Sequence, residues 1–198
     1  MIQVSWLVLS DSDRSDLKYS ALHFNPFKER LVALLPIIQY PDPVLAAKAE
    51  PVTEFNDELR KLAADMAETM YAAPGIGLAA NQVGSLKRIV VIDITEEKNS
   101  LIVLVNPYVK SHSDQFVEGE EGCLSLKGLY EKVTRPDSVV VCAQDLDGKS
   151  FEIEADGLLA VCLQHELDHL DGTVFIDHLS RLKKDRAKTK LRKLRKND

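Results

Sequence analysis

The chain has 198 residues, of which 45% are hydrophobic and 28% are charged, and this is enough for one domain with a substantial core. It has no apolar run of about 18 residues, which excludes a membrane-spanning helix. Three cysteines at unrelated spacings argue against a disulfide framework and for a reducing compartment. The net charge of −6 is unevenly distributed, because residues 181–198 hold ten Lys/Arg and only two Asp. An acidic body with a basic tail is typical of a tail that meets a polyanion.

Residues 1–34 are interpreted as an N-terminal extension. An apolar run from Val4 to Leu9 is followed by Asp11, Asp13 and Asp16, without the small-residue cleavage site of a secretory signal. Organellar transit peptides are normally poor in acidic residues, which argues against that class as well. We expect a poorly ordered extension or an over-long start, followed by a domain over residues 35–180.

A helix is predicted to start after Asn56, a suitable N-cap, because apolar residues recur at helical spacing up to Met70. Pro74 and Gly75 end it. Residues 75–84 (GIGLAANQVG) then contain mostly small side chains, which predicts a short loop whose backbone lies directly against a ligand. A flexible connector is the alternative interpretation of this segment.

Runs of β-branched residues predict mostly buried strands at residues 88–94 and 101–109, and two further strands at 139–143 and 150–154. The last two flank the sequence DLDG at 145–148, which is typical of a hairpin turn. A second helix is predicted between Gly157 and Gly172. Along one face of this helix, apolar residues are followed by two histidines, which indicates a core helix surrounded by strands. The predicted fold is therefore a single α+β domain with mixed, mainly antiparallel strands around a central metal-ligand helix.

The second predicted helix contains the pattern HELDH at 165–169. His165 and His169 lie four residues apart on one helix face and can present two imidazoles to one metal ion, with Glu166 beside them. This pattern is typical of the ligand pair and the general base of a metallohydrolase. Two ordinary histidines on a helix are the alternative.

A tetrahedral catalytic site needs a third protein ligand and an open position for water or substrate. Cys162 shares the helix face, but it lies about 10 Å from His169 along the helix axis, which is too far for both to reach one ion comfortably. Cys123 follows a glycine in EGCLS at 121–125 and is the better candidate. A buried free cysteine is the alternative for Cys123.

Three motifs in this order, GIGLAANQ at 75–82, EGCLS at 121–125 and HELDH at 165–169, resemble the signature of bacterial peptide deformylases. The similarity extends from residue 35 to residue 182. The resemblance implies removal of the formyl group from the initiator methionine of nascent polypeptides, with release of formate. It also implies Fe²⁺ held by Cys123, His165 and His169, although zinc, nickel or cobalt suit the same ligands.

The resemblance also assigns roles to individual residues. Glu166 would take a proton from metal-activated water and deliver it to the leaving amine. The Gln82 side-chain amide and the Leu124 backbone N–H would stabilise the oxyanion, and one such donor is worth roughly 3 to 4 kcal/mol. The methionine pocket would be lined by Ile76, Gly77, Leu158, Val161 and Cys162. A charged cluster would orient the site, formed by Arg135, Glu121 and Asp168.

Two positions depart from the family pattern. Gly119 stands where an apolar pocket residue is often found, and Lys127 replaces a usual proline. Both positions belong to the rim of the site and bear on which substrate side chains the site prefers. Because neither is a ligand or a catalytic group, we expect an active enzyme.

The basic segment 181–198 is expected to be helical, with too few apolar positions to be buried. Because the substrate emerges from a particle coated in RNA phosphate, the segment is expected to bind the ribosome; a solvated or disordered end is the alternative. Two other functions compete. A zinc peptidase would take a ligand downstream, where His178 is available, and a non-catalytic ribosome-associated metal-binding protein would leave Gln82 and Glu166 unused. We expect a monomer in the bacterial cytoplasm.

Overall fold

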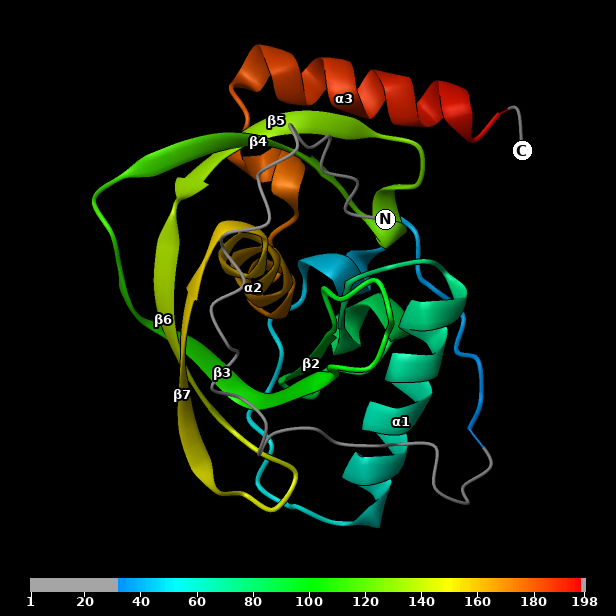
Figure 1. Cartoon of the computed structure of the whole chain (residues 1–198). Helices are drawn as coiled ribbons and strands as arrows, with labels where there is room; N and C mark the ends of the chain where they lie inside the picture. The colour runs from blue at the N-terminus through cyan, green and yellow to red at the C-terminus, as the bar shows by residue number, and fades with distance from the viewer. Residues whose placement is uncertain (1–31, 197–198) are drawn as a thin grey trace.

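The computed structural model describes residues 32–196, and nearly all of the expected N-terminal extension lies outside this range. The described part contains three α-helices, seven strands and four short 3₁₀ helices (Figure 1). The α-helices are α1 (Asp57–Ala72), α2 (Gly157–Leu170) and α3 (Arg181–Leu194). The strands are β1 (Gly77–Ala79), β2 (Ile89–Ile92), β3 (Ile102–His112), β4 (Phe116–Gly122), β5 (Tyr130–Pro136), β6 (Ser138–Gln144) and β7 (Ser150–Asp156). The 3₁₀ helices are η1 (Pro43–Ala46), η2 (Ala80–Val83), η3 (Leu124–Leu126) and η4 (Phe175–His178).

The strands form two separate sheets. One has five strands in the order β1-β2-β3-β6-β7, and the other is the β4–β5 hairpin. Every neighbouring pair of these strands is antiparallel, and a single parallel bridge joins Glu50 to Lys87. The expected α+β fold with mainly antiparallel strands is confirmed.

Helix α2 is the centre of the fold, because it packs against strands of both sheets. In Figure 1 it is seen almost end-on, with β6 and β7 on one side and the β4–β5 hairpin on another. Its apolar side joins Leu159, Ala160 and Leu163 to inward-facing residues of the large sheet in one core cluster. A helix buried on most of its circumference can hold polar side chains away from water, which suits a catalytic site.

Helix α1 covers the large sheet as its sequence predicts. The Asn56 side chain accepts a hydrogen bond from the backbone N–H of Leu59 at 3.1 Å, which caps the first turn. Leu59, Met66 and Met70 are fully buried against β1 and β2. The helix ends at Ala72, just before Pro74 and Gly75.

Two features differ from the sequence-based expectation. Residues 75–84 are not only a loop, because Gly77–Ala79 form β1, which pairs with β2, and Ala80–Val83 form η2. The β4–β5 hairpin was not expected at all. Strand β4 has the sequence FVEGEEG, which lacks apolar alternation because its buried residue Glu121 is charged. Period-2 apolar alternation, the usual sign of a strand, is therefore missing.

Helix α3 is more firmly packed than its composition indicates. Ala187 and Leu191 are buried in a cluster with Leu126, Leu129 and Phe175, and the same cluster contains Cys123. Lys184 of α3 also pairs with Asp177 of η4. Two apolar residues one helical turn apart are enough to anchor this face, because the rest of the cluster is supplied by the segments from η3 to β5 and by η4. The expectation of a helix with too few apolar positions to be buried is confirmed, because most residues of α3 are exposed and only Ala187 and Leu191 anchor one face.

Candidate metal centre

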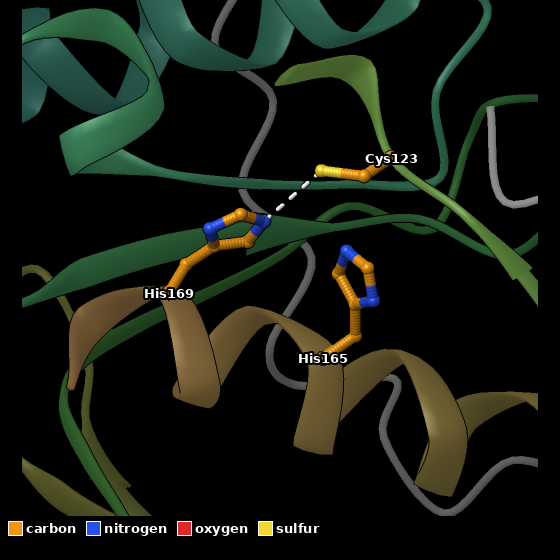
Figure 2. Close-up of side chains that lie close together, drawn as sticks. All are labelled: Cys123, His165 and His169. Carbon is orange, nitrogen blue, oxygen red and sulfur yellow. Dashed lines mark hydrogen bonds between the residues drawn. The ribbon is translucent and has the colours of Figure 1, made fainter. Parts of the chain in front are cut away.

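Three side chains converge between α2 and the end of β4. The thiol of Cys123 and one ring nitrogen each of His165 and His169 lie within 4.8 Å of one another, and all three residues are buried. Cys123 Sγ is 3.1 Å from His169 Nε2 (Figure 2). The two histidines come from adjacent turns of α2, and Cys123 follows directly after β4. No other such group of His, Cys, Asp or Glu is found within residues 32–196.

Cys162 does not join this group. It is fully buried one turn earlier on α2, where its Sγ lies 3.7 Å from the carbonyl oxygen of Ile76. Burial raises the pKa of the Cys162 thiol, and the nearby Glu166 carboxylate raises it further. Cys162 is therefore a neutral thiol, as suits a residue of the core.

The donor set fits a borderline divalent metal ion. Burial raises the pKa of the Cys123 thiol, but the imidazoles of His169 and His165 outweigh this effect and hold it well below its usual value. The Nδ1 atom of His165 lies 2.8 Å from Glu121 Oε2, so this nitrogen carries the proton and Nε2 is left free to bind a metal ion. A thiolate with two imidazoles is a ligand set for zinc, iron, nickel or cobalt.

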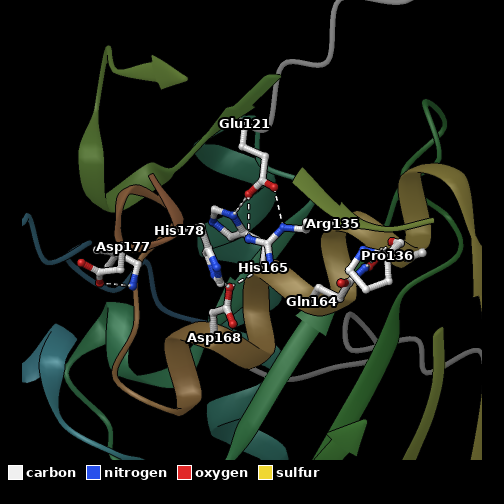
Figure 3. Close-up of polar contacts among 10 residues, drawn as sticks. Glu121, Arg135, Pro136, Gln164, His165, Asp168, Asp177 and His178 are labelled. Carbon is white, nitrogen blue, oxygen red and sulfur yellow. Dashed lines mark hydrogen bonds and ion pairs between the residues drawn. The ribbon is translucent and has the colours of Figure 1, made fainter. Parts of the chain in front are cut away.

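A charged network extends from His165 through Glu121 and Arg135 to Asp168 and His178 (Figure 3). Arg135 donates through Nε and Nη2 to both carboxylate oxygens of Glu121, and through Nη1 to Asp168 at 2.9 Å. His178 Nε2 lies 2.7 Å from the same Asp168 oxygen. Burial opposes ionisation of Glu121, but the hydrogen bonds from His165 and Arg135 lower its pKa to about 2. Glu121 is therefore a buried carboxylate that fixes the tautomer of His165.

Glu166 points to the same region and differs from Glu121 in its surroundings. It is 2% exposed, and burial raises the pKa of its carboxyl group. No described residue donates a hydrogen bond to its Oε2 atom. A buried carboxylate with a free oxygen and a raised pKa is suited to accept a proton from a water molecule and to pass it on.

Position 77 has no room for a side chain larger than hydrogen, because the Glu166 carboxylate fills the adjacent space. A Cβ atom at position 77 would collide with the Glu166 carboxylate and would lie 2.9 Å from Cys162 Sγ. The backbone of β1 therefore lies directly against the proposed general base. The sequence predicted a ligand against this backbone, and the structure places the side chains of Glu166 and Cys162 there.

Gln82 lies beside Cys123. Its Oε1 accepts a hydrogen bond from the backbone N–H of Ala79 at 2.8 Å, which leaves the amide NH₂ to point at the site. Gln82 Nε2 lies 3.2 Å from Ser125 Oγ and 3.5 Å from Cys123 Sγ. Leu124 follows Cys123 at the start of η3. The structure thus brings Gln82 to the three convergent side chains and Leu124 next to them in the chain.

The expected pocket residues divide into two groups. Ile76, Leu158 and Val161 are half-buried, whereas Gly77 and Cys162 are buried. Half-buried apolar residues beside the convergent side chains can contact a ligand, while Cys162 belongs to the core cluster of α2.

Two polar residues near the site were not singled out as parts of it by the sequence. Asn81 donates from its side-chain amide to the carbonyl oxygen of His169 and so holds the end of α2. His178 contacts Asp168, although it was considered only as a ligand of the rival peptidase. The place of Asn81 in the GIGLAANQ motif was a usable signal, whereas nothing in the sequence pairs His178 with Asp168.

An α+β fold around a helix with two converging histidines and a buried glutamate, completed by a cysteine from a neighbouring hairpin, defines a metal-dependent hydrolase. Comparisons with known proteins identify the family. The family model described as polypeptide deformylase matches residues 34–185. A peptide deformylase of Acinetobacter baumannii is 53% identical over 163 residues, which cover 82% of this chain and 93% of the relative.

Further relatives agree in sequence and in structure. Peptide deformylase 1 of Burkholderia multivorans is 52% identical over 175 residues, which cover 88% of this chain and 96% of the relative. The crystal structure of a peptide deformylase from Legionella pneumophila superposes with a TM-score of 0.79 at 48% identity, covering 83% of this chain and 96% of that one. The chain belongs to the peptide deformylase family. It is a hydrolase that removes the N-formyl group from nascent polypeptides.

Proposed function

We propose that Cys123, His165 and His169 hold one divalent metal ion, and that Glu166 is the proton-transfer group in deformylation of the initiator methionine. The observation that carries this proposal is the convergence of one thiol and two imidazoles within 4.8 Å, beside a buried carboxylate. A peptidase ligand at His178 is not favoured, because that residue is engaged with Asp168.

We infer that Fe²⁺ is the ion used in the cell, as the family resemblance implies, and that zinc, nickel or cobalt can replace it. A bound ion of this kind supplies Lewis acidity, which polarises the formyl carbonyl group and lowers the pKa of a coordinated water molecule. The soft thiolate of Cys123 supports a transition metal over magnesium or calcium. Anaerobic purification followed by metal analysis tests which ion is present.

Glu166 accepts the proton of the attacking water and delivers it to the nitrogen of the leaving amine. Its burial supports this role, because a raised pKa lets the carboxylate hold a proton between the two steps. The tight contact with Gly77 limits the directions in which the carboxylate can turn. Pre-positioning of this kind lowers the entropic cost of the proton transfer.

The oxyanion formed at the formyl carbon is stabilised by the side-chain amide of Gln82 and the backbone N–H of Leu124. The hydrogen bond from Ala79 to Gln82 Oε1 supports this role, because it fixes which end of the amide faces the substrate. One donor of this type is worth roughly 3 to 4 kcal/mol of transition-state stabilisation. The methionine side chain lies against the half-buried residues Ile76, Leu158 and Val161, with the buried residues Gly77 and Cys162 packed next to Ile76.

Replacement of Glu166 tests the proton-transfer role. Glu166→Gln keeps the shape and removes the base, so formate release from formyl-Met-Ala-Ser should fall by at least about 10²-fold while metal content stays stoichiometric. Glu97→Gln, at an exposed position in the loop after β2, is the matched control and should leave both quantities unchanged. Loss of metal from the Glu166 variant, with residual activity that follows occupancy, would assign Glu166 a ligand role instead.

We also propose that residues 35–180 form the catalytic domain and that the segment from residue 181 docks on ribosomal RNA. Eight of the ten basic residues of this segment are exposed, whereas its buried contacts are made by Ala187 and Leu191. In Figure 1, α3 lies along the outside of the β4–β5 hairpin. Clustered Lys and Arg side chains bind a phosphate backbone through salt-sensitive contacts that need no sequence recognition.

The docking test must leave the core contacts of α3 intact, so truncation is unsuitable. Three exposed residues one helical turn apart on α3 are changed to Gln: Arg186, Lys190 and Lys193. A control triple removes the same charge from exposed lysines of the body: Lys48, Lys132 and Lys149. Cosedimentation with ribosomes at low salt should weaken only for the α3 triple, with the difference shrinking as salt rises. Equal cosedimentation of the two triples would refute the docking role.

We infer that the protein acts as a monomer in the bacterial cytoplasm, where formylated nascent chains emerge. The bacterial origin of the similar peptide deformylases supports this location. No helix among residues 32–196 is long and apolar enough to cross a membrane. Size-exclusion chromatography with light scattering tests the oligomeric state.

A further inference from the structure

We propose that His178 is a positioning residue that acts, through Asp168, Arg135 and Glu121, on the orientation of the metal ligand His165. The inference rests on the proposed metal site. It concerns a residue of η4, outside all three sequence motifs of the site, on the far side of a charged network from the ligands (Figure 3).

The contacts form a continuous chain from solvent to the site. The exposed fraction of the side chain falls from 37% at His178 to 24% at Asp168, 5% at Arg135 and 1% at Glu121. His178 Nε2 and Arg135 Nη1 approach the same oxygen of Asp168, at 2.7 and 2.9 Å. His178 is therefore the outermost and most accessible member of the chain.

The rigidity of Arg135 lets this chain transmit position. A guanidinium group is planar, so Nη1 cannot move without turning Nε and Nη2. Nη1 is held by Asp168, while Nε and Nη2 hold Glu121. Glu121 Oε2 in turn lies 2.8 Å from His165 Nδ1. A shift of the Asp168 carboxylate therefore changes the direction in which the His165 ring points.

The same 3₁₀ helix touches His165 in a second way. The ring of Phe175, at the start of η4, is stacked on His165 with a centroid distance of 6.0 Å and an interplanar angle of 25°. Asp177 of η4 is paired with Lys184 of α3, which anchors the other side of the turn. Helix η4 is thus fixed well enough for His178 to hold Asp168 in place. Its first residue, Phe175, also restrains the ring of His165, which the charged network restrains as well.

The role of His178 depends on one donor at one distance, which allows matched variants. His178→Gln places an amide N–H at about the reach of Nε2, whereas His178→Asn is too short and His178→Leu has no donor. Because His178 is exposed, we expect these variants to fold, and thermal unfolding of the metal-free proteins checks this. His112→Leu, at an exposed histidine of β3, is the control for loss of a surface histidine.

The readouts are the rate at which the cobalt-loaded protein releases its ion to a chelator and the absorption bands of the bound cobalt. Groups that touch a ligand directly typically change metal affinity 10- to 100-fold. His178 is further away, so we expect release to be about 3- to 10-fold faster in the Leu and Asn variants, with shifted cobalt bands. The Gln variant and His112→Leu should resemble the wild type.

A second series of variants tests whether His178 acts through Asp168 or whether its loss makes the whole site less rigid. In an Asp168→Asn background, His178→Leu should add nothing to the release rate, because the chain is already cut. Three results would each overturn the inference. They are a wild-type rate of cobalt release from His178→Leu, equal release rates for the Gln and Leu variants, and additive effects of His178→Leu and Asp168→Asn. Cys123→Ser is measured in parallel: if it too fails to accelerate release, the proposed metal site itself is wrong, whereas a fast Cys123 variant beside a wild-type-like His178→Leu refutes the positioning role alone.

Discussion

Replacement of Gly77 by alanine tests the geometry of the site with a single methyl group. The new Cβ would lie 2.9 Å from Cys162 Sγ and closer still to a carboxylate oxygen of Glu166. The backbone of β1 cannot retreat freely, because Gly77 is held opposite Ile92 in the sheet. The Glu166 side chain must therefore move by about 1 Å, since ordinary carbon contacts lie near 3.5 to 4.0 Å.

The expected effect has two parts of different size. Overpacking in a close-packed core costs about 1 to 3 kcal/mol of unfolding free energy. Misplacement of a catalytic group by about 1 Å can cost 10²-fold in rate, so kcat/KM for formyl-Met-Ala-Ser should fall by about one to two orders of magnitude. Metal content should stay unchanged, because Gly77 does not belong to the group of Cys123, His165 and His169.

Gly119→Ala is the matched control for stability, because a Cβ at position 119 meets nothing within 4 Å. It should be neutral or slightly stabilising, as a Gly-to-Ala change reduces the entropy of the unfolded chain. The assays are formate release under steady-state conditions and urea unfolding of both variants. If Gly77→Ala kept wild-type kcat/KM and the same stability as Gly119→Ala, the assigned contact between β1 and Glu166 would be incorrect.

Three further predictions concern the metal ligands and their partner. Cys123→Ser should weaken metal binding and abolish most activity, whereas Cys162→Ser should leave metal content nearly intact; metal analysis after dialysis compares the two. The iron form should lose activity in air through oxidation of the Cys123 thiolate, and nickel should protect it; equal aerobic half-lives of the two forms would contradict an iron enzyme. The pKa of Glu121 is lowered to about 2 in the folded protein, so its contribution to stability is present above the unfolded value and is lost as the pH falls toward 2. The stability advantage of the metal-free wild type over Glu121→Gln, roughly 3 kcal/mol at neutral pH, should therefore shrink between about pH 5 and pH 2 in urea titrations.

The sequence predicted those parts of the structure that local patterns control. The cap at Asn56, the apolar spacing of α1 and the two histidines of α2 are all set within a few residues of the chain. The chemical reach of the side chains also selected Cys123 over Cys162, and the structure brings Cys123 to the histidines. Helical geometry was sufficient for these predictions.

Features that depend on distant partners were not predictable in the same way. Strand β1 has only three residues and is recognised by its pairing with β2, which lies beyond the following 3₁₀ helix. Strand β4 carries the charged residue Glu121 on its buried side, and this burial is acceptable only because Arg135 neutralises the carboxylate and His165 donates a hydrogen bond to it. Likewise, the packing of α3 depends on Phe175 and Leu129, which its own sequence does not reveal.

The division of the strands into two sheets has a consequence for the cohesion of the molecule. Cys123 follows a strand of the β4–β5 hairpin, while His165 and His169 belong to α2, whose apolar side shares a core cluster with the five-stranded sheet. An ion held by all three ligands would cross-link the hairpin to α2, which could otherwise open separately. Its binding energy would add to the free energy needed to open either of them. In the metal-free protein, amide hydrogen exchange should then become faster in β4 and β5 and change much less in α2. The exchange rate of the hairpin would therefore report whether the ion is bound.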